Sequence, residues 1–250
     1  DYDNMVMAFR IAEHPDVLLP VMVCQDGFIT SHAVQNILLL EDEEVKKFVG
    51  EYTPENYLLN AENPMAVGPY AVTNYYMEAR RSMAEGMVAS RKVILDIARE
   101  YETLSGRGYS FFEEYHTKDA DYVIVIMGSA SGAAKDACDK LRAKGKKVGV
   151  LKIRVFRPFP AAELAAALKN AKAIAAMDRA ESFSGNSGPM AAELKAALFD
   201  AKQCPEILSM VYGLGGRDIT VEDMEMIYAD LEAGNFECKE LPYRYVNVRE

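Results

Sequence analysis

The pattern of apolar and polar residues is most regular in the second half of the chain. Four apolar runs there have the length of buried strands, and they lie at 120–127, 147–154, 173–178 and 207–212. Helical patterns separate and follow these runs, at 133–144, 160–170, 189–201 and 221–232. Strands that alternate with helices in this way predict an α/β fold with a doubly wound, mainly parallel sheet. We assign this domain to residues 108–236 and treat 237–250 as a C-terminal tail.

The first part of the chain has a less regular pattern. An amphipathic helix is predicted over 3–13, and the apolar run at 17–24 predicts a buried strand. From 46 to 107, prolines and Asn-rich or Gly-rich turn signals predict a long connector, which contains one helix over 75–104. We therefore divide this part into a module at 1–45 and a connector at 46–107. Because the first helix starts almost at the first residue, we expect the chain to be the C-terminal portion of a longer polypeptide.

The helix predicted over 75–104 carries an apolar stripe at helical spacing. The stripe consists of Ala79, Met83, Met87, Ile94, Ile97, Tyr101 and Leu104. Such a stripe is typical of packing in a core or at an interface.

Composition and charge exclude several classes of function. Half of the 250 residues are hydrophobic and 26% are charged, which is typical of a folded protein. The net charge is −10, and the densest basic cluster is confined to 144–147, so neither nucleic acid nor an anionic membrane is an expected partner. No apolar run approaches the roughly 20 residues that a membrane-spanning helix needs.

The cysteines and histidines do not form a metal-binding pattern. The four cysteines are Cys24, Cys138, Cys204 and Cys238, and none belongs to a Cys-x-x-Cys pair. The sequence therefore predicts neither a zinc site nor an iron–sulfur site in this chain. The three histidines are equally dispersed. Scattered cysteines in an acidic chain are typical of a reducing compartment, which predicts a cytoplasmic protein.

Polar groups follow the apolar run at 17–24, beginning with Asp26-Gly27 and continuing to Thr30-Ser31-His32. The carboxyl edge of a sheet is where α/β folds bind ligands, so we expect Asp26, Ser31 and His32 to lie near an active site. These residues do not predict a hydrolase triad, since seven consecutive residues seldom supply its geometry and the chain has no G-x-S-x-G motif. His32 either borders a cofactor pocket or holds the loop together.

Two glycine-rich turns follow predicted strands. The turn at 128–132 contains Ser129 and Ser131 and opens a helix, which is a context for phosphate binding, although a tight turn explains it equally well. The turn at 213–218 contains Arg217 and precedes a looser form of capping box formed by Thr220 and Asp223. Ser129, Ser131 and Arg217 are therefore candidates for anion-binding or interface loops. No catalytic residue and no metal ligand is assigned.

The charged residues after the run at 173–178 suggest a simpler role. Asp178, Arg179 and Glu181 end this predicted strand. We interpret them as members of surface ion pairs, which contribute little individually.

Many short motifs along the chain together resemble the α subunit of the 2-oxoacid:ferredoxin oxidoreductases. In order, they are Ala8-Phe9-Arg10-Ile11-Ala12-Glu13, Pro20-Val21-Met22-Val23, Asp26-Gly27-Phe28, Ser31-His32, Asn63-Pro64, Gly68-Pro69, Tyr75-Tyr76-Met77-Glu78, Met127-Gly128-Ser129, Lys147-Val148-Gly149-Val150-Leu151-Lys152-Ile153-Arg154, Phe156-Arg157-Pro158-Phe159, Asp178-Arg179, Gly188-Pro189 and Tyr212-Gly213-Leu214-Gly215. Each motif is short, and the resemblance depends on their order.

The resemblance implies a fold and a function. It implies the end of a thiamine-pyrimidine-type module followed by a transketolase C-terminal-like domain. The assembled enzyme would decarboxylate a 2-oxoacid oxidatively on thiamine diphosphate and pass electrons through iron–sulfur clusters to ferredoxin. Pyruvate and oxalate are both candidate substrates, and Ala33, where many members have an acidic residue, leaves the choice open.

The resemblance also implies how the cofactors are divided among subunits. Thiamine diphosphate with Mg²⁺, and the iron–sulfur clusters, would be bound mainly by a β subunit, by iron–sulfur-bearing subunits, or by a part of the α subunit that precedes this chain. The chain alone is then expected to be inactive. Two alternatives stay open: a subunit of a thiamine enzyme without iron–sulfur clusters, of the transketolase or 2-oxoacid dehydrogenase type, and a non-catalytic assembly module.

Overall fold

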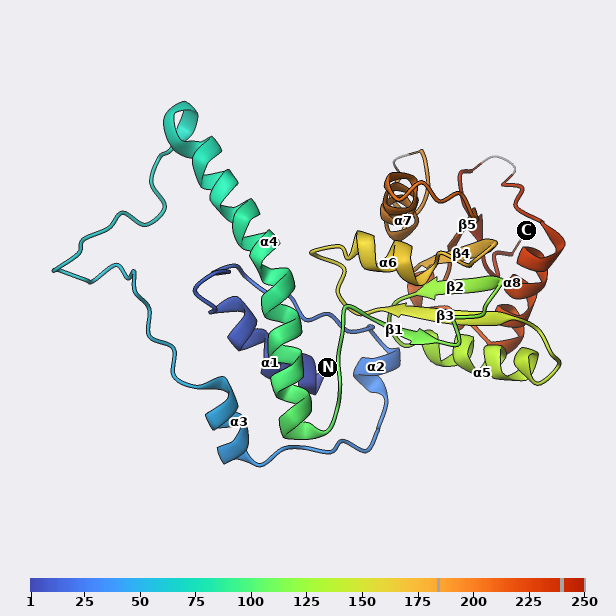
Figure 1. The fold of residues 1–250 in the computed structure, drawn as a ribbon, viewed down its shortest axis with the longest axis horizontal. Coiled ribbons are helices and arrows are strands. Elements are labelled where there is room, and N and C mark those ends of the chain that lie inside the picture. The colour runs from blue at the N-terminus through green and yellow to red at the C-terminus, as the bar shows by residue number, and fades with distance from the viewer. Residues whose placement is uncertain (184, 239–240, 250) are drawn as a thin grey trace. The chain divides into compact units, whose positions relative to one another are not determined.

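The computed structural model describes residues 1–183, 185–238 and 241–249, and it consists of two compact units (Figure 1). The first unit comprises Asp1–Cys24 and Gln35–Ser110, and the second comprises Gln25–Val34 and Phe111–Glu250. The short segment Gln25–Val34 therefore belongs to the second unit, although the residues on both sides of it belong to the first. Of the predicted tail, residues 239, 240 and 250 lie outside the described part of the chain.

A six-stranded sheet forms the centre of the second unit, with strand order β1-β3-β2-β4-β5-β6. The strands are β1 (Phe112–Tyr115), β2 (Tyr122–Ile126), β3 (Val148–Ile153), β4 (Ala173–Asp178), β5 (Glu206–Val211) and β6 (Arg244–Tyr245). All neighbours pair in parallel except β1, which pairs antiparallel with β3. The prediction of a doubly wound, mainly parallel sheet is confirmed. The short edge strands β1 and β6 were not predicted.

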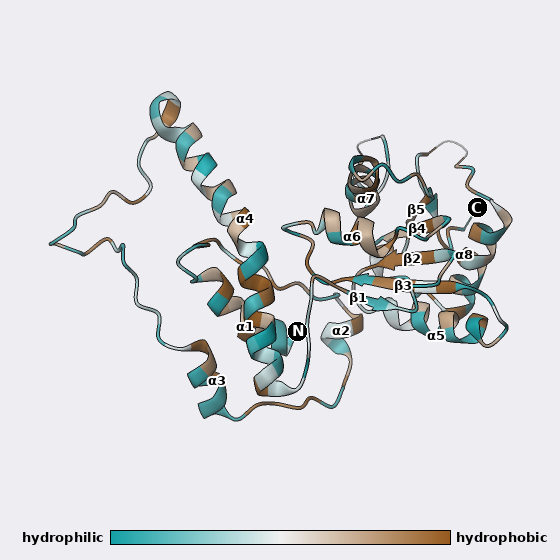
Figure 2. Cartoon of the chain, viewed as in Figure 1, coloured by the Kyte–Doolittle hydropathy of each residue, from teal (hydrophilic) through white to brown (hydrophobic). Residues whose placement is uncertain are grey.

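Helices cover both faces of this sheet. They are α5 (Ser131–Arg142), α6 (Ala161–Ala167), α7 (Pro189–Asp200) and α8 (Val221–Ala233). One buried cluster joins α5 and α8 to strand residues such as Ile124, and the other joins α6 and α7 to residues such as Val123. Successive residues of a strand thus enter opposite clusters, and the central strands are mostly apolar (Figure 2).

Three helices form the first unit: α1 (Tyr2–Ala12), α3 (Asp42–Val49) and α4 (Val72–Ser105). The apolar face of α1, including Met7 and Ile11, is buried, and α1 contacts both α3 and α4. The predicted helices at 3–13 and 75–104 are confirmed as α1 and α4, whereas α3 was not predicted. None of the helices in the described part of the chain combines the length and the apolar character that crossing a membrane requires.

The predicted strand at 17–24 is wrong. Val17 lies in a turn, the other residues have no regular secondary structure, and Met22 is 85% exposed. A strand is stable only when a neighbouring strand pairs with its backbone, and the described residues of the first unit contain none. Pro20 also removes one of the donors that such pairing needs. An apolar run of the right length was therefore not sufficient.

Only the second half of the apolar stripe on α4 is packed. Ile94, Ile97 and Tyr101 are buried, whereas Met83 and Met87 are 44% and 39% exposed. Large apolar residues are also exposed in the segment before α4 and in the N-terminal half of α4. They are Leu58, Leu59, Val67, Tyr70, Tyr75, Tyr76, Met77 and Val88. Within the described residues, core packing thus explains the stripe only from about residue 93 onward.

Gly86 lies where α4 comes close to the backbone of Val17, which follows α1 in the sequence. A methyl group on its Cα would lie 2.7 Å from the carbonyl oxygen of Val17. We expect Gly86→Ala to lower the free energy of unfolding by about 2 kcal/mol, because the clash outweighs the usual gain of alanine over glycine in a helix. Urea unfolding of the purified chain would measure the change. Gly132→Ala in α5 is the matched control, since nothing lies within 4 Å of its added methyl group. Equal effects of the two substitutions would contradict the prediction.

Candidate functional site

The point where the direction of the sheet's connections reverses lies between β2 and β4. These strands are neighbours, but the chain after β2 enters α5 on one face of the sheet, and the chain after β4 enters α7 on the other. The two loops therefore diverge at the carboxyl ends of the strands, and such a switch point is where open α/β sheets bind their ligands. The groups that meet there form the candidate site.

The carboxylate of Asp26 lies at this switch point. It accepts a hydrogen bond of 2.9 Å from the backbone N–H of Ser129, after β2, and one of 3.1 Å from Nη1 of Arg179, after β4. The Asp26 side chain is 15% exposed and that of Arg179 is 25% exposed. Arg179 is held in place independently, because its Nε donates to the carbonyl oxygen of Gly213 at 3.1 Å. The Asp26 carboxylate thus lies at the position where other open α/β sheets bind an external anion.

Gly128 allows this close approach. Its φ is +75°, a conformation that other residues rarely adopt, and a methyl group on its Cα would lie 3.0 Å from Oδ1 of Asp26. The Ser131 hydroxyl donates to the Gly128 carbonyl oxygen at 2.8 Å and closes the turn into α5. The predicted glycine-rich turn is therefore tight, and its anion is a side chain of the same chain.

The surroundings of Asp26 favour its charged form. Burial by itself raises the pKa of the carboxyl, but the hydrogen bonds from Ser129 and the charge of Arg179 outweigh burial, and the net pKa is lowered. A carboxyl whose pKa is lower in the folded state stabilises the fold at pH values above its unfolded pKa. This contribution is lost as the pH falls through the folded pKa.

The rest of the loop Gln25–Val34 folds on itself. The short helix α2 (Ile29–His32) follows Phe28, whose φ of +69° is unusual for a residue with a side chain. The Ser31 Oγ accepts from the Phe28 N–H at 2.9 Å and lies 2.8 Å from Nδ1 of His32. The Phe28 and His32 rings stack, with centroids 4.6 Å apart, and the Phe28 side chain is 73% exposed. Ser31 is thus an internal contact of the loop, and the two rings form its exposed surface.

The structure brings together only some of the predicted site residues. Asp26 meets Ser129 through the backbone of the latter, and Ser131 closes the same turn. Arg217 is not part of this cluster, since its guanidinium donates to the carbonyl oxygen of Asn247 in the tail. The capping box of Thr220 and Asp223 at the start of α8 is confirmed.

Two members of the cluster, Arg179 and Tyr212, were not predicted as site residues. Arg179, which was interpreted as a surface residue, binds Asp26, and the Tyr212 hydroxyl donates to the Met127 carbonyl oxygen at 3.3 Å. Burial raises the pKa of Tyr212 to about 12, so its hydroxyl stays protonated. Both residues directly follow strands that end at this edge, and that position is the signal that could have identified them.

Asp178 was also interpreted as a surface residue, but it is only 3% exposed. Its carboxylate accepts hydrogen bonds from the backbone N–H groups of Met190 and Ala191, at 2.8 and 3.2 Å, in the first turn of α7. Burial raises its pKa, and these two hydrogen bonds offset part of the increase. Side chains of the chain thus accept backbone hydrogen bonds at three places along this edge. Asp178 accepts from the first turn of α7, Asp26 from the turn that precedes α5, and Thr220 from the first turn of α8.

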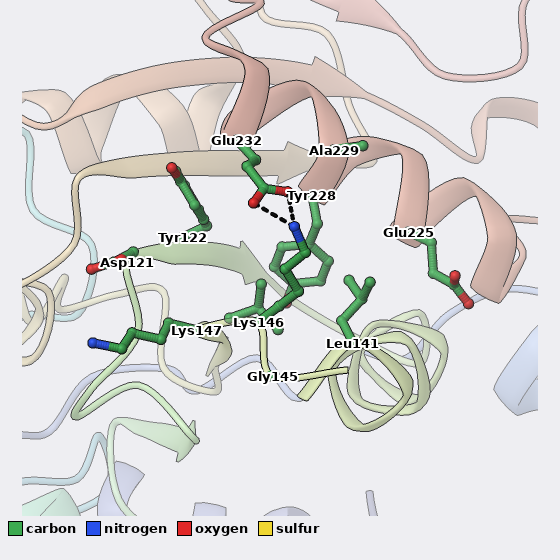
Figure 3. Close-up of a pocket in the computed structure, with 11 residues that line it drawn as sticks. Asp121, Tyr122, Leu141, Gly145, Lys146, Lys147, Glu225, Tyr228, Ala229 and Glu232 are labelled. Carbon is green, nitrogen blue, oxygen red and sulfur yellow. Dashed lines mark hydrogen bonds and ion pairs between the residues drawn. The ribbon is translucent and has the colours of Figure 1, made fainter. Parts of the chain in front are cut away.

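A separate cavity of about 310 Å³ lies at the other ends of the strands, next to the start of β2 and β3 (Figure 3). The Lys146 side chain extends to Glu232 of α8, and its Nζ contacts both carboxylate oxygens, at 2.6 and 2.8 Å. Tyr228 and Glu225 of α8 line it as well. Because this cavity lies at the amino ends of the strands, it is not at the ligand-binding edge of the sheet.

The residues present do not fit a complete site for a diphosphate and its metal. No group of three His, Cys, Asp or Glu side chains that could hold a metal ion occurs in the described ranges 1–183, 185–238 and 241–249. The anion position between β2 and β4 is taken by Asp26. We therefore derive no chemical step on a bound cofactor from this chain.

Comparisons with known proteins identify the family. Residues 1–99 match the family model described as pyruvate flavodoxin/ferredoxin oxidoreductase, thiamine diP-binding. Residues 120–224 match the model described as pyruvate:ferredoxin oxidoreductase core domain II. The two matched ranges follow each other and together include most of the chain.

Curated relatives agree with these matches. The chain is 44% identical over 249 residues to pyruvate synthase subunit PorA of Thermotoga maritima, which covers 100% of this chain and 63% of the relative. It is 41% identical to PorA of Methanothermobacter thermautotrophicus over 90% of this chain and 57% of the relative. It is 40% identical to ketoisovalerate oxidoreductase subunit VorA of Pyrococcus abyssi over 92% of this chain and 58% of the relative. The chain thus spans about 60% of the length of these relatives. Because both family models match in order and these subunits align along nearly the whole chain, the chain belongs to the α subunits of the 2-oxoacid:ferredoxin oxidoreductases.

Proposed function

We propose that this chain is part of the α subunit of a thiamine-diphosphate-dependent 2-oxoacid:ferredoxin oxidoreductase. The assembled enzyme oxidatively decarboxylates a 2-oxoacid and passes the electrons to ferredoxin. The observation that carries this proposal is the ordered match to a thiamine-diphosphate-binding family model and to core domain II of pyruvate:ferredoxin oxidoreductase.

Pyruvate is the substrate that we propose first. The relative from Thermotoga maritima, at 44% identity over the full chain, is a pyruvate synthase subunit. The ketoisovalerate oxidoreductase subunit of Pyrococcus abyssi is nearly as similar, at 40% identity, so overall identity supports the 2-oxoacid class more strongly than one member of it. Oxalate is retained as a third substrate to be tested.

The cofactors and partners form the second part of the proposal. We infer that Mg²⁺ and the diphosphate are bound by a β subunit or by other parts of the α subunit, and that separate subunits carry the iron–sulfur clusters. The cysteines support this division, since Cys138 is buried while Cys24 and Cys204 are exposed, and burial raises the pKa of the Cys138 thiol to about 11. A cytoplasmic location is part of the same proposal.

The experiment is a substrate-dependent reduction assay on the native complex. We expect pyruvate to reduce ferredoxin or a viologen dye, 2-oxoisovalerate and oxalate to give lower rates, and removal of thiamine diphosphate to abolish the rate. A complex that reduces neither acceptor with any of the three acids would refute the proposal. A thiamine-dependent reaction without reduction of either acceptor would instead favour the enzymes that lack iron–sulfur clusters.

The 250-residue chain alone is expected to bind thiamine diphosphate negligibly. The physical reason is that the anion position of the second unit is filled by Asp26 and the described residues offer no metal-binding group. Isothermal calorimetry with thiamine diphosphate and Mg²⁺ measures this directly, with the native complex as the positive control. Tight binding by the chain alone would contradict the expectation.

A further inference from the structure

We propose that Asp26 is a positioning residue, whose carboxylate joins the turn after β2 to Arg179 after β4 and thereby fixes the exposed Phe28–His32 pair. The inference rests on the proposed function only for its kinetic readout. The contact itself lies within the second unit, because Gln25–Val34 and both partners of Asp26 belong to that unit. It therefore has a structural readout of its own.

The groups around Asp26 are suited to hold a carboxylate. Arg179 has a second contact that orients it, since its Nε donates to the Gly213 carbonyl oxygen at 3.1 Å. The Ser129 N–H, in the turn before α5, donates to Asp26 at 2.9 Å. A guanidinium and a backbone N–H that converge on one position are the groups that bind carboxylates and phosphates elsewhere. In this chain the bound anion is tethered.

Asp26 is the main anchor of the loop Gln25–Val34. Among the hydrogen bonds of the described residues, those that join Gln25–Val34 to the sheet domain end on the Asp26 carboxylate. The other hydrogen bonds of the loop are internal, such as Thr30 Oγ1 to the same carboxylate at 3.3 Å and the His32 N–H to the Phe28 carbonyl oxygen at 3.2 Å. Loss of Asp26 would therefore release the loop as a whole.

The loop presents a stacked aromatic pair, Phe28 and His32. Phe28 keeps a positive φ, and such a conformation persists only where surrounding contacts impose it, as at functional sites. Its ring is stacked on His32 and 73% exposed. The pair is thus held by contacts within the loop and is exposed in this chain. Asp26 fixes the place of the loop that carries it.

The test uses Asp26→Ala in the native complex, with Asp200→Ala at the exposed end of α7 as the matched control. Hydrogen exchange of peptides covering 25–34 and 127–133 should be at least about tenfold faster in Asp26→Ala, because hydrogen bonds to charged groups are lost. Acetate should enter the vacated position and restore protection. In the double variant Asp26→Ala/Arg179→Met, acetate should have no effect. Asp26→Asn serves as the milder variant if Asp26→Ala does not assemble.

The kinetic part separates positioning from a purely structural role. With pyruvate as the substrate and a viologen dye as the acceptor, we expect Asp26→Ala to lower kcat about tenfold with little change in KM, and acetate to restore the rate. Adding Asp26→Ala to His32→Ala should cost no more than about twofold, since the first residue acts through the second. His32→Ala alone should lower turnover while leaving the melting temperature nearly unchanged.

The results test the role of Asp26 separately from the proposed enzyme function. Unchanged exchange in Asp26→Ala and Asp26→Asn, or faster exchange with unchanged kcat, would overturn it. Fully additive effects of Asp26→Ala and His32→Ala would overturn it as well. A wild-type complex without 2-oxoacid activity would refute the proposed function alone. In that case, acetate-dependent protection of the loop still supports the anchoring by Asp26, and its absence still overturns it.

Discussion

Asp178→Ala is expected to lower the free energy of unfolding of the second unit by about 3 kcal/mol. The substitution leaves the N–H groups of Met190 and Ala191 without their acceptor at a site that is almost fully buried. Each unsatisfied buried group costs about 1–3 kcal/mol, and part of that cost is relieved by water that enters the vacated space. Urea unfolding of the purified chain measures the change, and hydrogen exchange of α7 localises it.

Two further variants make the Asp178 result specific. Asp200→Ala at the exposed end of the same helix removes a carboxylate of the same type and should change stability by less than about 0.5 kcal/mol. Gly188→Ala should be as damaging as Asp178→Ala, because its methyl group would lie 2.2 Å from Oδ2 of Asp178. If Asp178→Ala behaved like Asp200→Ala, the capping role of Asp178 would be wrong.

In the first unit, Asp3→Ala is expected to have an effect of similar size, about 3 kcal/mol. The Asp3 carboxylate accepts from Nε and Nη2 of Arg107, each at 2.8 Å, from the Tyr101 hydroxyl at 2.6 Å, and from the Tyr109 hydroxyl. Its side chain is 12% exposed, so removing it leaves a partly buried guanidinium without its counter-charge. This cluster ties α1 to the end of α4 and to the residues that follow.

The Asp3 cluster also predicts a pH dependence. Burial raises the pKa of Asp3, but the hydrogen bonds from Arg107, Tyr101 and Tyr109 outweigh it and lower the pKa from 3.8 to about 2. The cluster therefore stabilises the unit above about pH 4, and this contribution is lost as the pH falls toward 2. Stability measured from pH 6 to 2 should fall less steeply in Asp3→Asn than in the wild type. The exposed Asp16→Asn is the control, and equal slopes in all three proteins would contradict the prediction.

The alternation of apolar runs and helical patterns determined most of the second unit. Buried parallel strands are apolar on both faces, so runs such as 173–178 stand out in a single sequence, and the observed β4 (Ala173–Asp178) has the predicted bounds. The edge strand β6 (Arg244–Tyr245) was missed because a two-residue strand depends on its neighbour β5 and carries no pattern of its own. Local sequence is informative where burial is uniform along an element.

The candidate site shows what only the tertiary structure decided. Asp26 was predicted to lie at the carboxyl edge of a sheet because it follows the run at 17–24, and that run is not a strand. Asp26 does lie at such an edge, but the edge belongs to β2 and β4, and its partner Arg179 is 153 residues away in the sequence. An Asp-Gly loop reveals its hydrogen-bonding capacity through its residue types, whereas the guanidinium that binds it is fixed only when distant strands assemble. For the same reason Arg179 and Asp178 had the appearance of surface charges: the sequence determines which groups are polar, and the fold determines which of them are buried with a partner.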